Sequence, residues 1–298
     1  SLCQKEKVDL VLIGPEKALA AGVVDALSAI GVKAFGPTKQ LAEIESSKVY
    51  SRELAAQLGI PGPRFATFDK GAHQLAMAWW KQLNAPIVVK QSGLAGGKGV
   101  VVPDNEAETE AAIMDACAIG QVVLEEMLQG PECSLMALCD GVIAVPLPIA
   151  QDHKRIGEGD TGPNTGGMGA VSPVPFANEK FMELVKQKVI EPTVKGLKAE
   201  NIDYKGFIFI GLMNHEGEPY VIEYNARMGD PETEVVLPRI ESDFLSLLIA
   251  ASNGTLSEQK ISILDQYAVT TMLVAGGYPG EYRKGDVLTG VEKVEDAI

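Results

Sequence analysis

The sequence predicts an α/β protein built from more than one lobe. Apolar runs at residues 8–13 and 32–35 flank an alanine-rich helical pattern at residues 18–30, and such a strand–helix–strand unit is expected to pair its strands in parallel. Strand-like and helical patterns alternate again from residue 64 onwards, and two later pairs of strand-like runs are separated by short turns. With 298 residues, 46% of them hydrophobic, the chain can bury more than one core.

The remaining elements follow from periodicity and from the residues that end each run. In the first half we expect helices at residues 46–58, 72–83 and 106–117, and strands at residues 64–68, 87–90, 100–102 and 122–127. In the second half we expect hairpins of strands 134–139 with 142–149 and 207–213 with 220–225, a polar loop at 157–172, helices at 179–200 and 243–253, and a strand at 267–275. Ser46 or Ser47 should cap the first of these helices, and Pro192 should interrupt the long one.

The charge balance narrows the range of partners. Lys and Arg number 26 against 40 Asp and Glu, a net charge of −14. An acidic chain gains nothing from a phosphate backbone, so we expect small-molecule substrates held by a few local cations, and no nucleic acid. No apolar run has the length of a membrane span, and the first residues do not resemble a signal peptide. The four cysteines lack metal-ligand spacing, so we expect buried thiols in a cytoplasmic protein. We also expect a monomer or weak dimer.

The glycine-rich segment GLAGGKG, residues 93–99, is the first functional candidate. Glycines let the backbone approach a ligand closely, and Lys98 adds a positive charge suited to phosphate. The spacing differs from a Walker A loop, and strands rather than a helix are expected on both sides. An ordinary turn is the alternative, although four glycines in seven residues are entropically costly for one. Lys90, at the end of the preceding strand, is a second candidate cation or simply a solvated lysine.

The segment VIEYNAR is the second candidate. In a strand, Glu223, Asn225 and Arg227 fall on one face, and Ile222 falls on the other. A carboxylate beside an amide oxygen suits a hard cation such as Mg²⁺, and an arginine can hold a phosphoryl group. A solvated edge strand is the alternative, but the very apolar run GFIFIGLM precedes this segment and indicates a central hairpin.

Two weaker candidates complete the set. Glu125 and Glu126 close a predicted strand and Glu132 follows after a turn, which suits an adenine edge and ribose hydroxyls but equally suits solvated glutamates. The segment QDHKR adds positive charge before a glycine-rich stretch, GPNTGGMGA. His153 alone is more typical of a surface residue than of a catalyst.

Together these segments resemble the ATP-grasp superfamily, and within it the phosphoribosylamine–glycine ligases. The matching stretches are IVVKQSGLAGGKGV, VVLEEMLQGPECS, QDHKRIGEGDTGPNTGGMGA, VIEYNARMGDPETE and AGGYPGEYRKGDV. The resemblance implies an α/β (α+β) ATP-grasp fold with three parts. These are a partial, doubly wound N-terminal βαβ lobe at 1–37, an ATP-grasp domain at 38–265 with a lid subdomain at 63–127, and the start of a β-rich C-terminal lobe at 266–298. The family members extend beyond both ends of this sequence, so on this comparison the chain would correspond to part of a longer protein.

The resemblance also implies roles for individual residues. The ATP site would be formed by Lys90, Lys98, Glu125, Glu126, Met127, Leu128, Glu132, Arg155 and Asn164. Glu223 and Asn225 would bind Mg²⁺ or Mn²⁺, and Arg227 and Lys98 would act on the transferred phosphoryl group. The glycine and phosphoribosylamine sites would be shaped by Asp152, His153, Lys154, Gly166, Gly167, Met168, Gly169, Asp230, Pro231 and Glu232.

The activity implied is ATP-dependent ligation of glycine to phosphoribosylamine through glycyl phosphate, a step of purine biosynthesis. Another ATP-grasp carboxylate–amine ligase or carboxylase would share the flap and the Glu-x-Asn strand, but not QDHKR or GPNTGGMG. An inactive nucleotide-binding fragment is a different class of explanation, since it would bind ATP without releasing phosphate.

Overall fold

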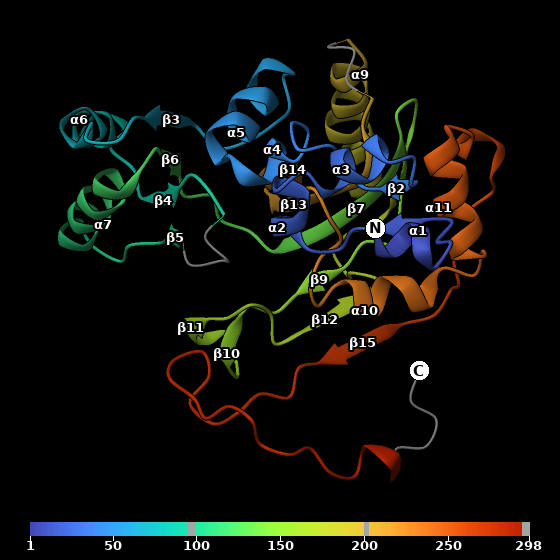
Figure 1. Ribbon diagram of the computed structural model, residues 1–298. Helices are drawn as coiled ribbons and strands as arrows, with labels where there is room; N and C mark the ends of the chain where they lie inside the picture. The colour runs from blue at the N-terminus through green and yellow to red at the C-terminus, as the bar shows by residue number, and fades with distance from the viewer. Residues whose placement is uncertain (95–98, 200–202, 294–298) are drawn as a thin grey trace.

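A four-stranded antiparallel sheet lies at the centre of the molecule (Figure 1). The computed structural model describes residues 1–94, 99–199 and 203–293. The sheet has the order β14-β13-β7-β8. Its strands are β7 (Glu132–Asp140), β8 (Ala144–Pro146), β13 (Lys205–His215) and β14 (Glu218–Asn225). Both predicted hairpins are confirmed, and β13 is central, which explains why GFIFIGLM is so apolar.

Side chains alternate along these strands and build a core on each face of the sheet. Ile208 and Ile210 face one core, and Phe207 and Phe209 face the other. The first core is covered by α4 (Glu43–Ser46), α5 (Lys48–Gln57) and α8 (Glu179–Val185). The second is covered by α10 (Thr233–Val236) and α11 (Phe244–Asn253).

A smaller antiparallel sheet forms a separate lobe, drawn at the left of Figure 1. Its order is β3-β6-β4-β5. The strands are β3 (Phe65–Phe68), β4 (Ile87–Gln91), β5 (Val100–Val101) and β6 (Val122–Glu126). Helices α6 (His73–Leu83) and α7 (Glu106–Ile119) pack on it around their own apolar cluster. The lobe therefore has a core of its own, as expected of a separate subdomain.

The N-terminal segment contains the expected parallel pair, β1 (Val11–Leu12) with β2 (Ala34–Phe35). The helix predicted for residues 18–30 is wrong in one respect. It is divided into α2 (Glu16–Ala20) and α3 (Val23–Ala29) by Gly22, whose φ of +84° ends one helix and begins the next. A short helix, α1 (Leu2–Lys5), precedes them.

The segment after β8 is more ordered than the sequence predicted. Residues 157–172 were expected to be a loop because glycine-rich segments carry no hydrophobic alternation. In the structure they contribute to two small sheets. The strands are β9 (Gln151–Asp152), β10 (Arg155–Gly157), β11 (Thr161–Asn164), β12 (Gly169–Ser172) and β15 (Ala268–Thr271). β10 pairs with β11, whereas β15, β12 and β9 form one antiparallel sheet. β15, from the stretch assigned to the C-terminal lobe, thus shares a sheet with strands of the predicted ATP-grasp domain.

The long helix predicted near Pro192 is interrupted, as expected. α8 runs into a π-helical turn, η1 (Lys186–Ile190), and α9 (Glu191–Ala199) follows. Proline cannot donate to the carbonyl one turn earlier, and the change of helical register lies at that turn. Short 3₁₀ turns complete the described elements: η2 (Leu237–Arg239), η3 (Leu256–Glu258) and η4 (Val291–Lys293).

The predicted cap of the helix at residues 46–58 is confirmed. The Ser47 hydroxyl accepts a hydrogen bond from the Tyr50 amide at 3.2 Å, and α5 begins at the next residue. Among the described residues, no helix is both long and apolar enough to cross a membrane.

Candidate active site

A β-bulge in β14 shapes the floor of the candidate site. Gly211 pairs with Glu223 while its neighbour Leu212 pairs with Val221, so Ile222 is an extra residue on β14. The bulge turns Ile222 and Glu223 toward the same pocket. The prediction that Ile222 lies on the opposite face is therefore wrong. A Cβ on Gly211 would lie 2.6 Å from Cγ of Glu223, so this glycine makes room for the glutamate.

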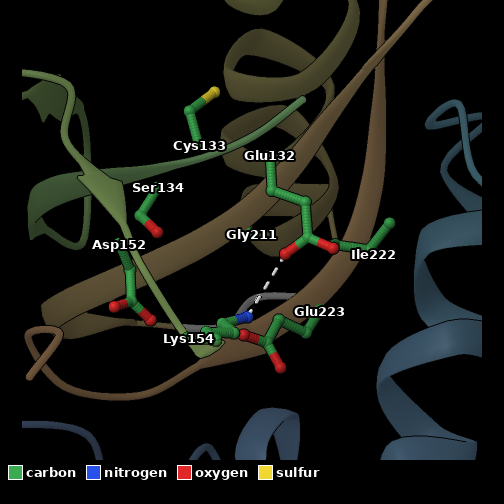
Figure 2. Close-up of a pocket in the computed structure, with 8 residues that line it drawn as sticks. All are labelled: Glu132, Cys133, Ser134, Asp152, Lys154, Gly211, Ile222 and Glu223. Carbon is green, nitrogen blue, oxygen red and sulfur yellow. Dashed lines mark hydrogen bonds and ion pairs between the residues drawn. The ribbon is translucent and has the colours of Figure 1, made fainter. Parts of the chain in front are cut away.

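The pocket lies where β7, β9 and the β13–β14 hairpin meet (Figure 2). It is lined by Glu132, Cys133, Ser134, Asp152, Lys154, Gly211, Ile222 and Glu223. Figure 2 shows the Lys154 ammonium between carboxylates, with its Nζ 3.3 Å from Oε2 of Glu132. Four predicted site residues from three separate motifs are thus brought together: Glu132, Asp152, Lys154 and Glu223.

The charges in this pocket are strongly coupled. Burial alone would lower the pKa of Lys154, but the carboxylates of Glu223, Glu132 and Asp152 outweigh it and raise the pKa. Lys154 therefore stays protonated and holds three acidic groups within one site. A cation surrounded in this way can hold an anionic substrate group once that group displaces one of the carboxylates.

Asp152 has the most perturbed carboxyl group of the site. Burial, followed by the charge of Glu232, raises its pKa to about 7. Its Oδ1 atom is buried and has no hydrogen-bond partner in the described structure. Glu232 is only 3% exposed, and its Oε1 accepts a hydrogen bond from the Ser134 hydroxyl at 2.8 Å.

Gly167 brings the glycine-rich loop against this carboxylate. Its φ is +124°, and a Cβ there would lie 2.3 Å from Pro231 and 2.9 Å from Oδ1 of Asp152. A side chain at this position would push the loop away from Asp152. The segments at residues 166–169 and 229–232, both predicted to shape substrate sites, thus pack together over Asp152.

A buried ion cluster joins the lid lobe to the rest of the molecule. Glu125, on β6, accepts from Arg52 at 2.9 Å and pairs with Lys90 at 2.8 Å. Lys90 also donates to the Ile222 carbonyl, and Arg52 donates to the carbonyls of Val221 and Ile222. The β14 bulge exposes these two carbonyls to the cations. Lys90 and Glu125, both predicted to contact ATP, therefore also connect the lid to the central sheet.

The predicted adenine segment lies at the boundary between lid and sheet. Glu126 is the last residue of β6 and forms a two-pronged pair with Arg64, with both distances at 2.7 Å. Hydrogen bonding to Arg64 lowers the pKa of Glu126. The amide of Met127 donates to Pro86, and both Met127 and Leu128 are half-buried between the lobes.

Arg227 lies beyond the end of β14 and points toward the N-terminal helices. It pairs with Glu45 at 3.1 Å and approaches Glu16 at 4.0 Å. Burial raises the pKa of Glu45, an effect that the charge of Arg227 opposes. The residues lining the pocket do not include Arg227, which sets it apart from Glu223 on the same face.

The other predicted residues have less defined surroundings. Arg155 donates to the Gly162 carbonyl, and both Arg155 and Asn164 are exposed on the β10–β11 hairpin. His153 is exposed, and its main chain pairs with Gly169 and Met168. Asp230 is exposed as well. Lys98 and most of the glycine loop lie outside the described residues.

Sequence reasoning missed Lys48 and Arg52, which lie one turn apart on α5. Lys48 donates to the Gly93 carbonyl at 3.3 Å, where the glycine segment begins. Burial lowers its pKa, and the charge of Glu223 acts in the opposite sense. A basic pair spaced by four residues on a helix of an acidic chain is a signal that could have revealed them.

Comparison with known proteins agrees with this geometry. Residues 46–233 match the family model described as "Phosphoribosylglycinamide synthetase, ATP-grasp (A) domain", and residues 1–45 match the N domain of the same enzyme. The chain belongs to the phosphoribosylamine–glycine ligase family. The two matches meet between residues 45 and 46, whereas the sequence analysis placed this boundary between 37 and 38.

Individual relatives support the same assignment. The phosphoribosylamine–glycine ligase of Mesorhizobium japonicum is 44% identical over 98% of this chain and 70% of its own length. The crystal structure of the Thermotoga maritima enzyme superposes with a TM-score of 0.76 and 35% identity, covering 85% of this chain and 65% of that one. A biotin carboxylase from Campylobacter jejuni, 18% identical over 90% of this chain and 59% of its own, has a TM-score of 0.71. This last likeness concerns the fold alone, and the matched family model is the one that names an ATP-grasp domain.

Proposed function

We propose that the chain catalyses the ATP-dependent ligation of glycine to phosphoribosylamine, the activity for which its relatives are named. The observation that carries this proposal is the convergence of Glu223, Lys154 and Asp152 in one pocket beside the lid attachment. This arrangement offers a metal-binding carboxylate, a cation and a second carboxylate to one reacting group. Small-molecule substrates, a cytoplasmic location and a monomer or weak dimer complete the proposal, and four free cysteines favour the reducing compartment.

ATP would lie between the lid and the central sheet. Lys90 and Lys48 would bind the phosphates, with Arg155 and Asn164 approaching them from the β10–β11 hairpin. Lys98, which lies outside the described residues, is proposed for the same role from its place in the glycine-rich segment. The main chain of Glu126, Met127 and Leu128 would contact adenine, and Glu132 the ribose. Arg227 would reach the transferred phosphoryl group after leaving Glu45. Lys90, Lys154 and Arg227, each now paired with a carboxylate, would supply positive charge without a large basic surface.

The residues present suit a divalent cation, Mg²⁺ or Mn²⁺. Glu223 and Asn225 offer a carboxylate and an amide oxygen from one face of β14, and Mg²⁺ commonly takes one or two protein ligands together with substrate phosphates. Among the described residues, no three His, Cys, Asp or Glu side chains cluster to hold a metal on their own. When bound, the ion would supply charge neutralisation at the phosphate oxygens.

The chemistry then has two steps. A glycine carboxylate oxygen forms a bond to the γ-phosphorus of ATP while the bond to the bridging oxygen breaks, giving glycyl phosphate and ADP. The amine of phosphoribosylamine next forms a bond to the carbonyl carbon, and phosphate leaves. The chain's residues mainly position groups and stabilise charge, and the lid lobe keeps water from the acyl phosphate.

The test follows ATP labelled with oxygen-18 between its β and γ phosphorus atoms. Scrambling of the label in the presence of glycine and absence of the amine would report reversible glycyl phosphate formation. We expect scrambling with glycine and not with other carboxylic acids. Scrambling with another acid would assign a different ligase, and ATP binding without any scrambling would indicate an inactive nucleotide-binding fragment.

The Glu223→Gln variant gives the matching test of the site. It should lose most turnover, with partial recovery at high Mg²⁺, because the amide binds the cation more weakly. Glu218→Gln, on the same strand but paired with Lys188 far from the pocket, is the control and should keep full activity. Unchanged turnover in Glu223→Gln would remove this residue from the metal site.

A further inference from the structure

The pocket contains one carboxylate oxygen that the described structure leaves unsatisfied. Among the described residues, Oδ1 of Asp152 and Nε of Arg239 are the buried side-chain polar atoms without a hydrogen-bond partner. Arg239 lies away from the pocket and already donates through its other nitrogens. A buried acceptor without a donor is costly, and a substrate that brings a donor removes that cost. Oδ1 of Asp152 is therefore the acceptor in this site that a hydrogen-bond donor on a ligand would satisfy.

We propose that Asp152 accepts the proton released by the amine of phosphoribosylamine when it attacks glycyl phosphate, with Glu232 as the positioning residue. This inference rests on the proposed function and adds to it a residue for the second chemical step. An amine that forms a bond to a carbonyl carbon becomes cationic and must lose a proton. Oδ1 of Asp152 would first accept a hydrogen bond from this amine and then take its proton, while phosphate leaves with the electron pair of the broken carbon–oxygen bond.

The other carboxylates of the pocket are already occupied. Glu132 is paired with Lys154, and Glu232 accepts from the Ser134 hydroxyl. Glu223 is the metal ligand of the proposed function. Asp152 is left with a free oxygen and a neighbouring carboxylate, so its affinity for a proton is higher than that of an ordinary aspartate. Its pKa of about 7, raised by burial and then by Glu232, matches a general base that works near neutral pH.

The charged groups around Asp152 come from each neighbouring element. Glu232 precedes α10, Glu132 opens β7, Lys154 follows β9, and Glu223 lines the pocket from β14. From β12, the residues paired with β9 are the uncharged Ala170 and Val171. Glu232 and Glu132 raise the pKa of Asp152, and Lys154 lowers it. Removal of the Glu232 charge should therefore make Asp152 a weaker base.

The experiment separates the two chemical steps in the Asp152→Asn variant. Glycine-dependent label scrambling in ATP measures glycyl phosphate formation, and amide formation with phosphoribosylamine generated in situ measures the second step. We expect scrambling near the wild-type rate and a fall of about 10²–10⁴-fold in amide formation. Asp115→Asn, an exposed acid on α7 of the lid, is the matched control and should leave both steps unchanged.

The pH profile gives a readout that a purely structural role would not move. In the wild type, amide formation should rise with pH through about 7, the pKa of Asp152. In Glu232→Gln this rise should shift to lower pH, and in Asp152→Asn it should disappear, leaving the titration of the amine itself.

The outcomes distinguish this inference from the proposed function. If Asp152→Asn retains amide formation, or loses scrambling to the same extent, Asp152 is not the proton acceptor and the inference fails. An unshifted profile in Glu232→Gln would overturn the role given to that residue. Absence of glycine-dependent scrambling in the wild type itself would instead overturn the proposed function.

Discussion

Glu125 and Asp152 both place carboxylate oxygens away from water, but their surroundings are opposite. Glu125 is 4% exposed and lies between two cations, Arg52 and Lys90. Asp152 lies beside another carboxylate, Glu232, and its Oδ1 has no partner. The first carboxylate joins three elements from two lobes, α5, β4 and β6, and its charge is satisfied within the chain. The second belongs to a pocket whose charges are not balanced by the chain alone.

Whether a buried carboxylate is paired within the chain can distinguish residues that stabilise the fold from residues available to bind a ligand. A buried charge that is fully paired is costly to break, because removal of one partner strands the other. A buried acidic group left without a donor raises the free energy of the folded state until a proton or a ligand arrives. By this criterion Arg52 and Glu125 connect the lid to the sheet, and Asp152 is the candidate for a role in ligand binding or catalysis.

The largest expected effect comes from breaking the paired cluster. Arg52→Met should lower the free energy of unfolding by about 3–5 kcal/mol, because it leaves Glu125 half-paired and removes the hydrogen bonds that Arg52 donates to the carbonyls of Val221 and Ile222. Urea denaturation followed by circular dichroism would measure the change. Arg64→Met is the matched control, since it breaks an exposed pair with the adjacent Glu126 and should have little effect. Equal losses in the two variants would contradict the role given to the buried cluster.

Much of the fold could be predicted from the sequence because its signals are local. Both hairpins of the central sheet, the parallel N-terminal pair and the Ser47 cap follow from alternation, turn residues and a hydroxyl at a helix start. The strands between residues 155 and 172 could not, since glycine and polar residues there carry no hydrophobic period. Their pairing is set by partners elsewhere, among them β15, about a hundred residues later in the chain.

The site shows the same limit. The motifs pointed to Glu223, Lys154 and Asp152, and the structure brings them into one pocket. The face predicted for Ile222 was wrong, because a bulge depends on the pairing of β14 with β13 and cannot be identified from the sequence of β14 alone. Arg52 was missed because its burial against another lobe depends on contacts far along the chain, and its four-residue spacing from Lys48 was the only local sign. Individual roles within the ATP, metal and substrate sites stay predictions.

A second prediction uses the uncompensated carboxylate. The pKa of Asp152 in the folded protein, about 7, exceeds its ordinary value of 3.8, so the folded state binds the proton more tightly than the unfolded chain. The resulting stabilisation is complete below about pH 4 and is lost as the pH rises through about 7. Because the group is partly screened by solvent, we expect a loss of about 1–3 kcal/mol from this source.

Asp152→Asn should remove that component of the pH dependence. Relative to the wild type, its free energy of unfolding should rise between about pH 4 and about pH 8, as urea titrations at several pH values would show. Asp115→Asn should track the wild type throughout. A constant difference between Asp152→Asn and the wild type across this range would mean that Asp152 is not strained by its neighbours.

The smallest effect concerns a third buried carboxylate, Asp140, which is 1% exposed and satisfied by main-chain donors instead of cations. Its Oδ1 accepts from the amides of Val142 and Ile143 at 2.8 Å, and its Oδ2 accepts from that of Leu256 at 3.0 Å. Asp140→Asn should lower the free energy of unfolding by about 1–2 kcal/mol. The NH₂ group that replaces one carboxylate oxygen cannot accept a hydrogen bond from the main-chain N–H it faces. Glycine-dependent label scrambling should be unchanged, since Asp140 lies at the far end of β7 from the pocket. A loss of scrambling with stability intact would show that pairing inside the chain does not mark a residue as structural, and the distinction drawn between Glu125 and Asp152 would fail.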